Sequence, residues 1–112
     1  MEEREEVQYR KNIQILFETI EEAFENVDPD VAECEDSMGA LVITLAKESK
    51  CILSAQPSVR QLWLAVAARG TAYHFNYDPI LASWLDDKGR GVEVKSFLKR
   101  YLKETTGLEI KI

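Results

Sequence analysis

The fold is decided by residues 37–67, which read SMGALVITLAKESKCILSAQPSVRQLWLAVA. Short apolar and β-branched runs alternate there with clusters of residues that favour turns. Runs of this kind are typical of β-strands, and short connections make neighbouring strands antiparallel. The predicted turns are Ser37-Met38-Gly39 and Lys47-Glu48-Ser49, and the predicted strands are Leu41–Leu45, Lys50–Leu53 and Gln61–Ala67.

Strand signals continue on both sides of this stretch. Residues 32–35 alternate between small and acidic side chains, which predicts a first strand that pairs with Leu41–Leu45. After Gly70, Thr71–Asn76 has the composition of a fifth strand, and Ala82–Leu85 that of a sixth. We therefore expect a meander of five to six short strands between about Asp30 and Leu85.

Apolar residues recur at steps of three and four near both ends of the chain, which is the spacing of an amphipathic helix. The first pattern predicts a helix from about Glu3 to Val27, ended by Asp28-Pro29-Asp30, because the residue before a proline is pushed out of the α region. The second predicts a helix over Val92–Thr106, ended by Gly107. The alternating tail after Gly107 is expected to place an apolar edge on the domain.

These elements predict an α+β fold. The simplest arrangement is a two-layer sandwich, with the two terminal helices packed on one face of a single antiparallel sheet of five to six strands. Residues 1–112 are expected to form one domain, with the other sheet face in water. No apolar run approaches the roughly 20 residues that a membrane span requires.

Acidic charge is concentrated in residues 18–36, which we call the acidic segment. The whole chain has 20 acidic and 14 basic side chains, a formal charge of −6, whereas the chain outside this segment has 11 and 14. The segment itself contains no Lys or Arg, and its nine acids are Glu18, Glu21, Glu22, Glu25, Asp28, Asp30, Glu33, Glu35 and Asp36. Such a segment either leaves its carboxylates in bulk water or places a cation or a basic partner beside them, and the acidic balance argues against binding to a nucleic-acid backbone.

Four of these acids share one side of the first predicted helix. Glu18, Glu21, Glu22 and Glu25 fall within an arc of about 100°, and we call them the acidic ridge. Carboxylate oxygens suit hard cations, and the lack of His or Cys among them argues against a tetrahedral zinc site. Such a ridge predicts weak, poorly selective binding of a hydrated ion. The alternative is a solvated helix face.

Trp63 is the second candidate site. If Leu62 and Leu64 point into the core, Gln61 and Trp63 share the opposite, solvent-facing side of their strand. An exposed aromatic beside amides is typical of an anchor in a protein interface. The alternative is a Trp covered by its neighbours on the sheet.

The remaining reactive side chains form no catalytic pattern. His74 is the single histidine and is at most a minor metal ligand, whereas Cys34 and Cys51 lie in predicted strands and are expected to be buried. Neither cysteine has the spacing of a metal site or a disulfide framework. The sequence contains no phosphate loop, no cofactor fingerprint and no Ser/His/Asp or Cys/His set.

The order of elements, the acid-rich first helix and strand, and the run QPSVRQLWL at residues 56–64 resemble the frataxin family, including its bacterial members. The most specific part is the spacing of Gln56, Gln61, Trp63 and Leu64, and Gly70 followed by Tyr73-His74-Phe75 is similar to a stretch of bacterial frataxins. Three positions depart from the family pattern: Ser54 replaces an Asn, Pro57 follows Gln56 directly, and Asp36 replaces an apolar residue.

The resemblance implies a small protein of iron–sulfur cluster assembly, an iron donor or a regulator, with weakly bound iron on surface carboxylates. Its implied partners are a cysteine desulfurase and the iron–sulfur scaffold protein, contacted through Gln56, Gln61 and Trp63. We expect a monomer that can oligomerise with iron, without a membrane or nucleic-acid partner. The implied location is the cytoplasm for a bacterial chain and the mitochondrial matrix for a mature eukaryotic form. The implied metal-ligating residues are Glu18, Glu21, Glu22, Glu25, Asp28, Asp30, Glu33 and Glu35.

Two other functions stay open at this point. A ferroxidase would oxidise ferrous iron on the ridge, and this is the single enzymatic candidate. Ferroxidase centres, however, usually combine inward-facing carboxylates with His. A plain acidic docking module would bind a basic surface and treat metals as counterions.

Overall fold

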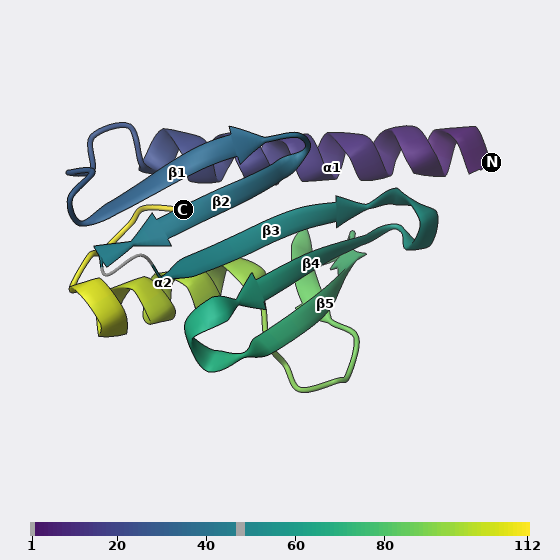
Figure 1. The fold of residues 1–112 in the computed structure, drawn as a ribbon. Helices are drawn as coiled ribbons and strands as arrows, with labels where there is room; N and C mark the ends of the chain where they lie inside the picture. The colour runs from purple at the N-terminus through teal and green to yellow at the C-terminus, as the bar shows by residue number, and fades with distance from the viewer. Residues whose placement is uncertain (1, 47–48) are drawn as a thin grey trace.

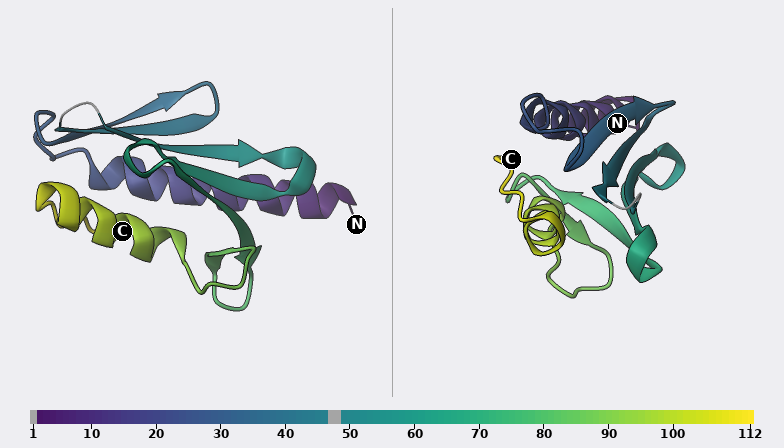
Figure 2. Two further views of the ribbon diagram at one scale, coloured as in Figure 1. Left: turned by 60° about the horizontal axis from the view of Figure 1, so that its bottom comes forward. Right: turned by 60° about the vertical axis from the view of Figure 1, so that its left-hand side comes forward.

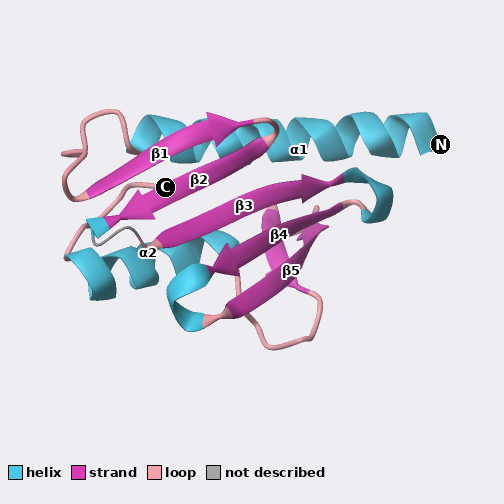
Figure 3. Ribbon diagram, in the orientation of Figure 1, coloured by secondary structure: helices cyan, strands magenta, loops and turns pink. Residues whose placement is uncertain are grey.

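The computed structural model describes residues 2–46 and 49–112, and it has two layers, with both α-helices on one face of a β-sheet (Figures 1 and 3). The helices are α1 (Glu2–Ala23) and α2 (Val94–Thr106), at the two ends of the chain. The strands are β1 (Ala32–Ser37), β2 (Ala40–Leu45), β3 (Lys50–Gln56), β4 (Gln61–Val66), β5 (Thr71–Asp78) and β6 (Ser83–Asp86). Short 3-10 helices, η2 (Pro57–Val59) and η3 (Ala67–Arg69), connect β3 to β4 and β4 to β5.

The sheet is a simple meander. Its six strands are neighbours in chain order, β1 to β6, and every neighbouring pair is antiparallel. Figure 2 shows the two helices side by side on one face of the sheet, which leaves the opposite face without a covering layer. The predicted α+β two-layer sandwich is therefore confirmed.

The core lies between the helices and the inner sheet face. Leu41, Ile43, Leu53 and Leu62 are completely buried there, at alternate positions of their strands. Ile20 and Leu98 contribute buried side chains from the two helices, and Ile110 of the tail is also buried, as its alternation predicted. Burial of apolar surface contributes a free energy of roughly 25 cal/mol per Å² and holds the two layers together. Across the part of the chain that the structure describes, no helix combines the length and apolar character required to cross a membrane.

The first helix is shorter than predicted, since α1 ends at Ala23 and not at Val27. After Ala23 the chain forms turns whose hydrogen bonds join residues three positions apart. The N–H of Phe24 donates to the carbonyl of Glu21, and the N–H of Val27 donates to the carbonyl of Phe24, both at 3.1 Å. Carboxylates are unfavourable at the negative end of a helix, and the last turn carries no basic residue. As a result, Glu25 lies in the turn after the helix.

Other boundaries also differ from the prediction. β3 continues to Gln56, three residues past Leu53, because Gln56 pairs in register with Gln61. α2 begins at Val94 and not at Val92, because the Glu93 carboxylate accepts hydrogen bonds from the first-turn backbone and caps the helix. Gly107 ends α2 as predicted, with φ of 76° that favours glycine. The predicted turn Lys47-Glu48-Ser49 falls partly outside the described residues.

Candidate functional site

The open face of the sheet collects the predicted partner-binding residues. In the register of β3 and β4, Gln56 lies opposite Gln61, and Ser54 opposite Trp63. Leu62 and Leu64 are buried, whereas Gln61 and Trp63 lie on the other side of β4, so the predicted orientation of this strand is confirmed. The antiparallel register thus gathers amide, hydroxyl and indole groups on the face that no helix covers.

Trp63 is half-buried and held from two sides. Its indole Nε1–H donates to the side-chain oxygen Oε1 of Gln61 at 2.9 Å. Its ring stacks on the imidazole of His74, with centroids 4.2 Å apart and an interplanar angle of 14°. The two residues are directly opposite in the β4–β5 register, which places their side chains together. The stack covers one face of the indole and leaves part of the ring accessible.

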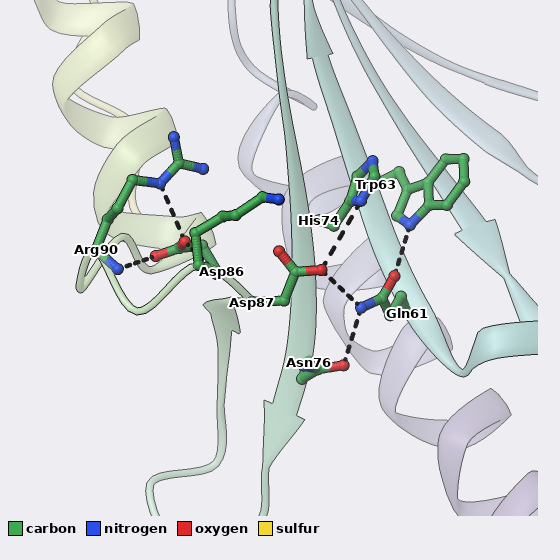
Figure 4. A network of polar contacts seen from close by, with 8 residues as sticks. Gln61, Trp63, His74, Asn76, Asp86, Asp87 and Arg90 are labelled. Atoms are coloured by element: carbon green, nitrogen blue, oxygen red, sulfur yellow. Dashed lines mark hydrogen bonds and ion pairs between the residues drawn. The ribbon is translucent and has the colours of Figure 1, made fainter.

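A polar network extends from Trp63 to the loop after β6 (Figure 4). The Gln61 amide Nε2 donates to Asn76 Oδ1 at 3.2 Å and to Asp87 Oδ2 at 3.1 Å. The same Asp87 oxygen lies 3.8 Å from Nδ1 of His74. We call Gln61, Trp63, His74, Asn76 and Asp87 the sheet-face cluster. Because each of its side chains contacts another, the cluster is ordered before any partner arrives, which lowers the entropic cost of binding.

Tyr9 of α1 supports this cluster from inside the fold. Its hydroxyl donates to the carbonyl of Gln61 at 2.7 Å and accepts the backbone N–H of Gln56 at 3.0 Å. The ring is buried and makes an edge contact with Trp84, with centroids 6.1 Å apart. Burial raises the pKa of this hydroxyl, against smaller opposing effects of the Gln56 hydrogen bond and the charge of Arg10. The first helix is thereby tied to both glutamines at the end of the β3–β4 hairpin.

Asp86 organises the loop that carries Asp87. Its buried carboxylate accepts the backbone N–H groups of Lys88 (2.9 Å), Arg90 (3.1 Å) and Val92 (3.1 Å), and also the Arg90 side chain at 3.1 Å. Burial raises the pKa of this carboxyl, but the hydrogen bonds and the Arg90 charge together outweigh burial and lower it below its ordinary value. Asp86 therefore stays ionised and fixes the loop next to the sheet-face cluster.

The acidic segment is divided among several surfaces. Glu21, Glu25, Glu33 and Glu35 line one open hollow of about 560 Å³ between the end of α1 and β1. Glu22 and Asp28 line a different hollow, next to the C-terminal tail. Glu18 lies with Glu21 and Asp36 along a groove of about 430 Å³ whose apolar side includes Phe17 and Pro57. Asp30 sits in the exposed turn after α1, and its backbone N–H donates to Asp28 Oδ1 at 2.9 Å.

These carboxylates are not gathered into a preformed metal site. Within residues 2–46 and 49–112, no group of three or more His, Cys, Asp or Glu side chains has the geometry to hold an ion. In the same part of the chain, none of the nine acids of the acidic segment has a basic group within ion-pair distance. A metal would have to be bound by side chains that move together, with water completing its coordination. The eight predicted ligands stay a prediction.

Neither cysteine is suited to act as a nucleophile or as a metal ligand. Cys51 is completely buried, as predicted, whereas Cys34 is half-buried because β1 is an edge strand. Burial raises the pKa of each thiol to about 11, helped at Cys34 by the neighbouring carboxylates of Glu21, Asp36 and Glu35. A thiol with so high a pKa is a poor nucleophile and a poor metal ligand.

Several residues of the site were not found from the sequence. His74 stacks on Trp63 because the two residues are opposite in the β4–β5 register. A four-residue connection that ends in Gly70 defines this register. Asp87 joins the cluster through a loop, and Tyr9 reaches it from a helix 47 residues before Gln56. Local sequence patterns carry no signal for contacts of such separation.

Comparison of the sequence with known proteins identifies the family of this chain. A family model described as a frataxin-like domain matches residues 2–108. The chain belongs to the frataxin family. It is 36% identical over 102 residues to the iron-sulfur cluster assembly protein CyaY of Stutzerimonas stutzeri, an alignment that covers 91% of this chain and 89% of that protein.

Solved frataxin structures share the fold. Frataxin from Psychromonas ingrahamii aligns with a TM-score of 0.81 at 21% identity, over 95% of both chains. Trimeric frataxin of the yeast Saccharomyces cerevisiae, complexed with ferrous iron, aligns with a TM-score of 0.62 at 20% identity, over 93% of this chain and 87% of that one. At these identities the likeness supports the frataxin fold, and the assignment to the family rests on the sequence matches.

Proposed function

We propose that this frataxin-family protein acts in iron–sulfur cluster assembly, where its open sheet face binds the cysteine desulfurase–scaffold complex and its acidic segment holds iron weakly. The observation that carries the proposal is the sheet-face cluster. In this cluster Trp63 is ordered by polar neighbours and is partly accessible, on a sheet face without a covering layer. The chain that carries it is 36% identical to a named cluster-assembly protein.

The sheet-face cluster has the composition of an interface centre. Trp63 offers a large amphipathic surface, and Gln61, Asn76 and Asp87 surround it with hydrogen-bonding groups. Interfaces concentrate their binding energy in such aromatic anchors, with polar groups at the rim. Gln56 and Ser54 extend the same face, and the Gln56 amide donates to the Ser54 hydroxyl at 3.4 Å. The Ser at position 54 thus takes part in the surface that a partner would meet.

The proposed iron role rests on the acidic segment. Its carboxylates are oxygen ligands on an exposed surface, and none of them is neutralised by a basic group within the described part of the chain. Ligands of this kind bind hard cations through partly retained water. The yeast relative's structure with ferrous iron supports an association of this fold with that metal.

The interface proposal is tested with Trp63→Ala, measured both for urea unfolding and for affinity to the desulfurase–scaffold complex. We expect affinity to fall by roughly 2 kcal/mol or more, as at interface hot spots. We expect stability to fall by only about 1 kcal/mol, because the ring is half-buried and its stack on His74 contributes about 0.5–1.5 kcal/mol.

Ile80→Ala is the matched control, since Ile80 is a 92% exposed apolar residue in the β5–β6 turn, outside the sheet-face cluster. It should change neither quantity. Unchanged affinity in folded Trp63→Ala would refute the proposed interface. A loss of stability of about 3–5 kcal/mol would mean that Trp63 belongs to the core.

One observation favours a second function for the acidic segment. The described residues hold no preformed group of three metal ligands, which fits a docking surface for a basic partner better than a dedicated metal site. Anaerobic titration with ferrous iron, compared with calcium and magnesium at equal ionic strength, separates the two functions. Preference for iron supports the iron role, and equal weak binding of all three ions supports a docking surface.

A further inference from the structure

A hollow lies where the first half of α1 passes the β3–β4 connection and the end of β5 (Figures 1 and 2). Its volume is about 490 Å³, which is within the range of small-molecule sites. We call it the α1–β5 groove, and it is defined by Asn12 of α1, Val59 and Arg60 at η2, and Asn76 and Tyr77 of β5. None of these residues belongs to the acidic segment.

One part of the groove lining is apolar. It consists of the Tyr9 ring together with Val59, Tyr77 and Pro79. The Tyr9 hydroxyl is already engaged by the backbone of the β3–β4 hairpin. Val59 is 54% exposed, so this apolar surface meets water. A ligand with a hydrocarbon body would remove it from water, which is favourable in proportion to the area covered.

The polar part of the lining offers hydrogen-bond donors. The Asn12 Oδ1 accepts from Gln8 Nε2, and the Asn76 Oδ1 accepts from Gln61 Nε2, both at 3.2 Å. Within the part of the chain that the structure describes, no group accepts a hydrogen bond from Nδ2 of either asparagine. The Arg60 guanidinium adds further donors and a positive charge. Donors beside a cation suit an anion with acceptor oxygens, such as a carboxylate.

The Arg60 side chain has an acidic neighbour at the rim of the groove. Its Nη1 lies 3.7 Å from Oε2 of Glu5, whose side chain is 68% exposed. An ion pair of this kind contributes little to stability, so a carboxylate with a hydrocarbon body can compete with Glu5 for the guanidinium. The backbone holds Arg60 in place: its φ is 50°, and its N–H donates to the Pro57 carbonyl at 3.1 Å.

We propose that the α1–β5 groove binds a small amphipathic carboxylate. The carboxylate group lies at Arg60 and the two asparagine amides, and the hydrocarbon body covers Val59 and Tyr77. This inference is independent of the function proposed above, because it requires neither the acidic segment nor Trp63. It also predicts that Glu5, although it lines the groove, opposes binding.

Titration of the ¹⁵N-labelled protein with octanoate, followed by NMR, tests the proposal. We expect saturable shifts at the backbone amides of Val59 and Arg60 and at the side-chain amides of Asn12 and Asn76. In the series acetate, butyrate, hexanoate and octanoate, affinity should rise about two- to fourfold with each methylene that the groove covers. Octylammonium has the same chain length and the opposite charge, and it should bind far more weakly than octanoate.

Two charge-removing variants should act in opposite directions. Arg60→Gln should weaken octanoate binding roughly fivefold or more, whereas Glu5→Gln should strengthen it by up to about fivefold. The matched controls are Arg69→Gln and Glu104→Gln. They remove the same charges from an exposed pair separated by 3.5 Å, at η3, beyond the opposite end of β4. Both controls should bind octanoate with wild-type affinity, and far-UV circular dichroism confirms that each variant is folded.

Several outcomes would overturn the proposal. Equal binding of octanoate and octylammonium would show apolar adhesion without recognition of charge. Unchanged octanoate affinity in folded Arg60→Gln would remove the carboxylate from this position, and so would shifts confined to residues outside the groove. If Arg60→Gln does not fold, Glu5→Gln decides the matter, since unchanged or weaker binding in that variant contradicts the proposed competition.

Discussion

Removing a single oxygen atom from Tyr9 tests how the sheet-face cluster is supported. In Tyr9→Phe the ring and its edge contact with Trp84 are retained, but two hydrogen bonds are lost, to the carbonyl of Gln61 (2.7 Å) and from the N–H of Gln56 (3.0 Å). Each backbone group left unsatisfied in a buried place costs about 1–3 kcal/mol. The site is only partly buried, so water can replace part of the loss, and we expect a total of about 2–3 kcal/mol.

The assay is equilibrium unfolding in urea, with the midpoint and the slope fitted separately. We expect the midpoint to fall while the slope stays constant, because the surface exposed on unfolding is nearly unchanged. Tyr77→Phe is the matched control. Its ring is half-buried and makes an edge contact with the same Trp84, and its hydroxyl makes no hydrogen bond with the described residues. A loss below about 0.5 kcal/mol in Tyr9→Phe, the ordinary range for surface changes, would refute a structural role for the hydroxyl.

The same variant connects stability to the proposed function. The lost bonds join α1 to the two residues that pair at the end of the β3–β4 hairpin, Gln56 and Gln61. Fraying of this end should increase hydrogen exchange at Gln56, whose amide has lost its acceptor. Partner affinity should then fall although no atom of the exposed surface has changed. Normal exchange at Gln56 would contradict this connection.

Four further predictions concern charge and ionisation. Replacing the four glutamates of the acidic ridge with Gln should raise the free energy of unfolding in metal-free buffer by about 1 kcal/mol, because unpaired like charges are removed; a lower melting temperature would contradict this. Asp86→Asn should lower the melting temperature at pH 7 by losing acceptor capacity for the loop, and because the Asp86 pKa is lowered in the folded protein, the wild-type advantage should shrink as pH falls through that pKa. Cys51 should carry about 100-fold less thiolate than an unfolded thiol at pH 8, given its pKa of about 11 against 9.0, so a disulfide reagent should label it mainly in urea. Because the pKa of Cys51 is raised in the folded protein, the free energy of unfolding keeps its full value below pH 9 and falls by about 2–3 kcal/mol as pH rises toward 11. Cys51→Ala should therefore lose less stability at alkaline pH than the wild type does.

The strands could be predicted because their residues alternate. Leu62 and Leu64 point inward and Gln61 and Trp63 outward, as expected from a period of two, and the short turns leave an antiparallel meander as the simple solution. The two helices were equally clear from apolar steps of three and four. Each helix has one apolar stripe and the sheet has one apolar face, and all of these are buried when both helices pack on that face.

The end of the first helix and the surroundings of Trp63 could not be predicted in this way. Apolar periodicity runs on to Val27, but the helix ends at Ala23, where charge and the coming Asp28-Pro29 outweigh the pattern. The cluster around Trp63 depends on Asp87, from a loop held by a buried carboxylate, and on a tyrosine from α1. Composition showed that residues 18–36 are acidic, but it could not show that eight of the nine acidic side chains are divided among three hollows, with Asp30 in an exposed turn.

The position of β1 gives its carboxylates a further physical consequence. β1 is the outermost strand at one side of the sheet, whereas β6, at the other side, is partly covered by a bridge between Leu85 and Glu93. An open strand edge is a template for pairing with another chain, and charged side chains oppose such pairing. Glu33 and Glu35 are exposed on β1, so their repulsion protects the fold against edge-to-edge aggregation. A saturating multivalent cation that neutralises them removes this protection and makes the sheet itself the source of insoluble, strand-paired material.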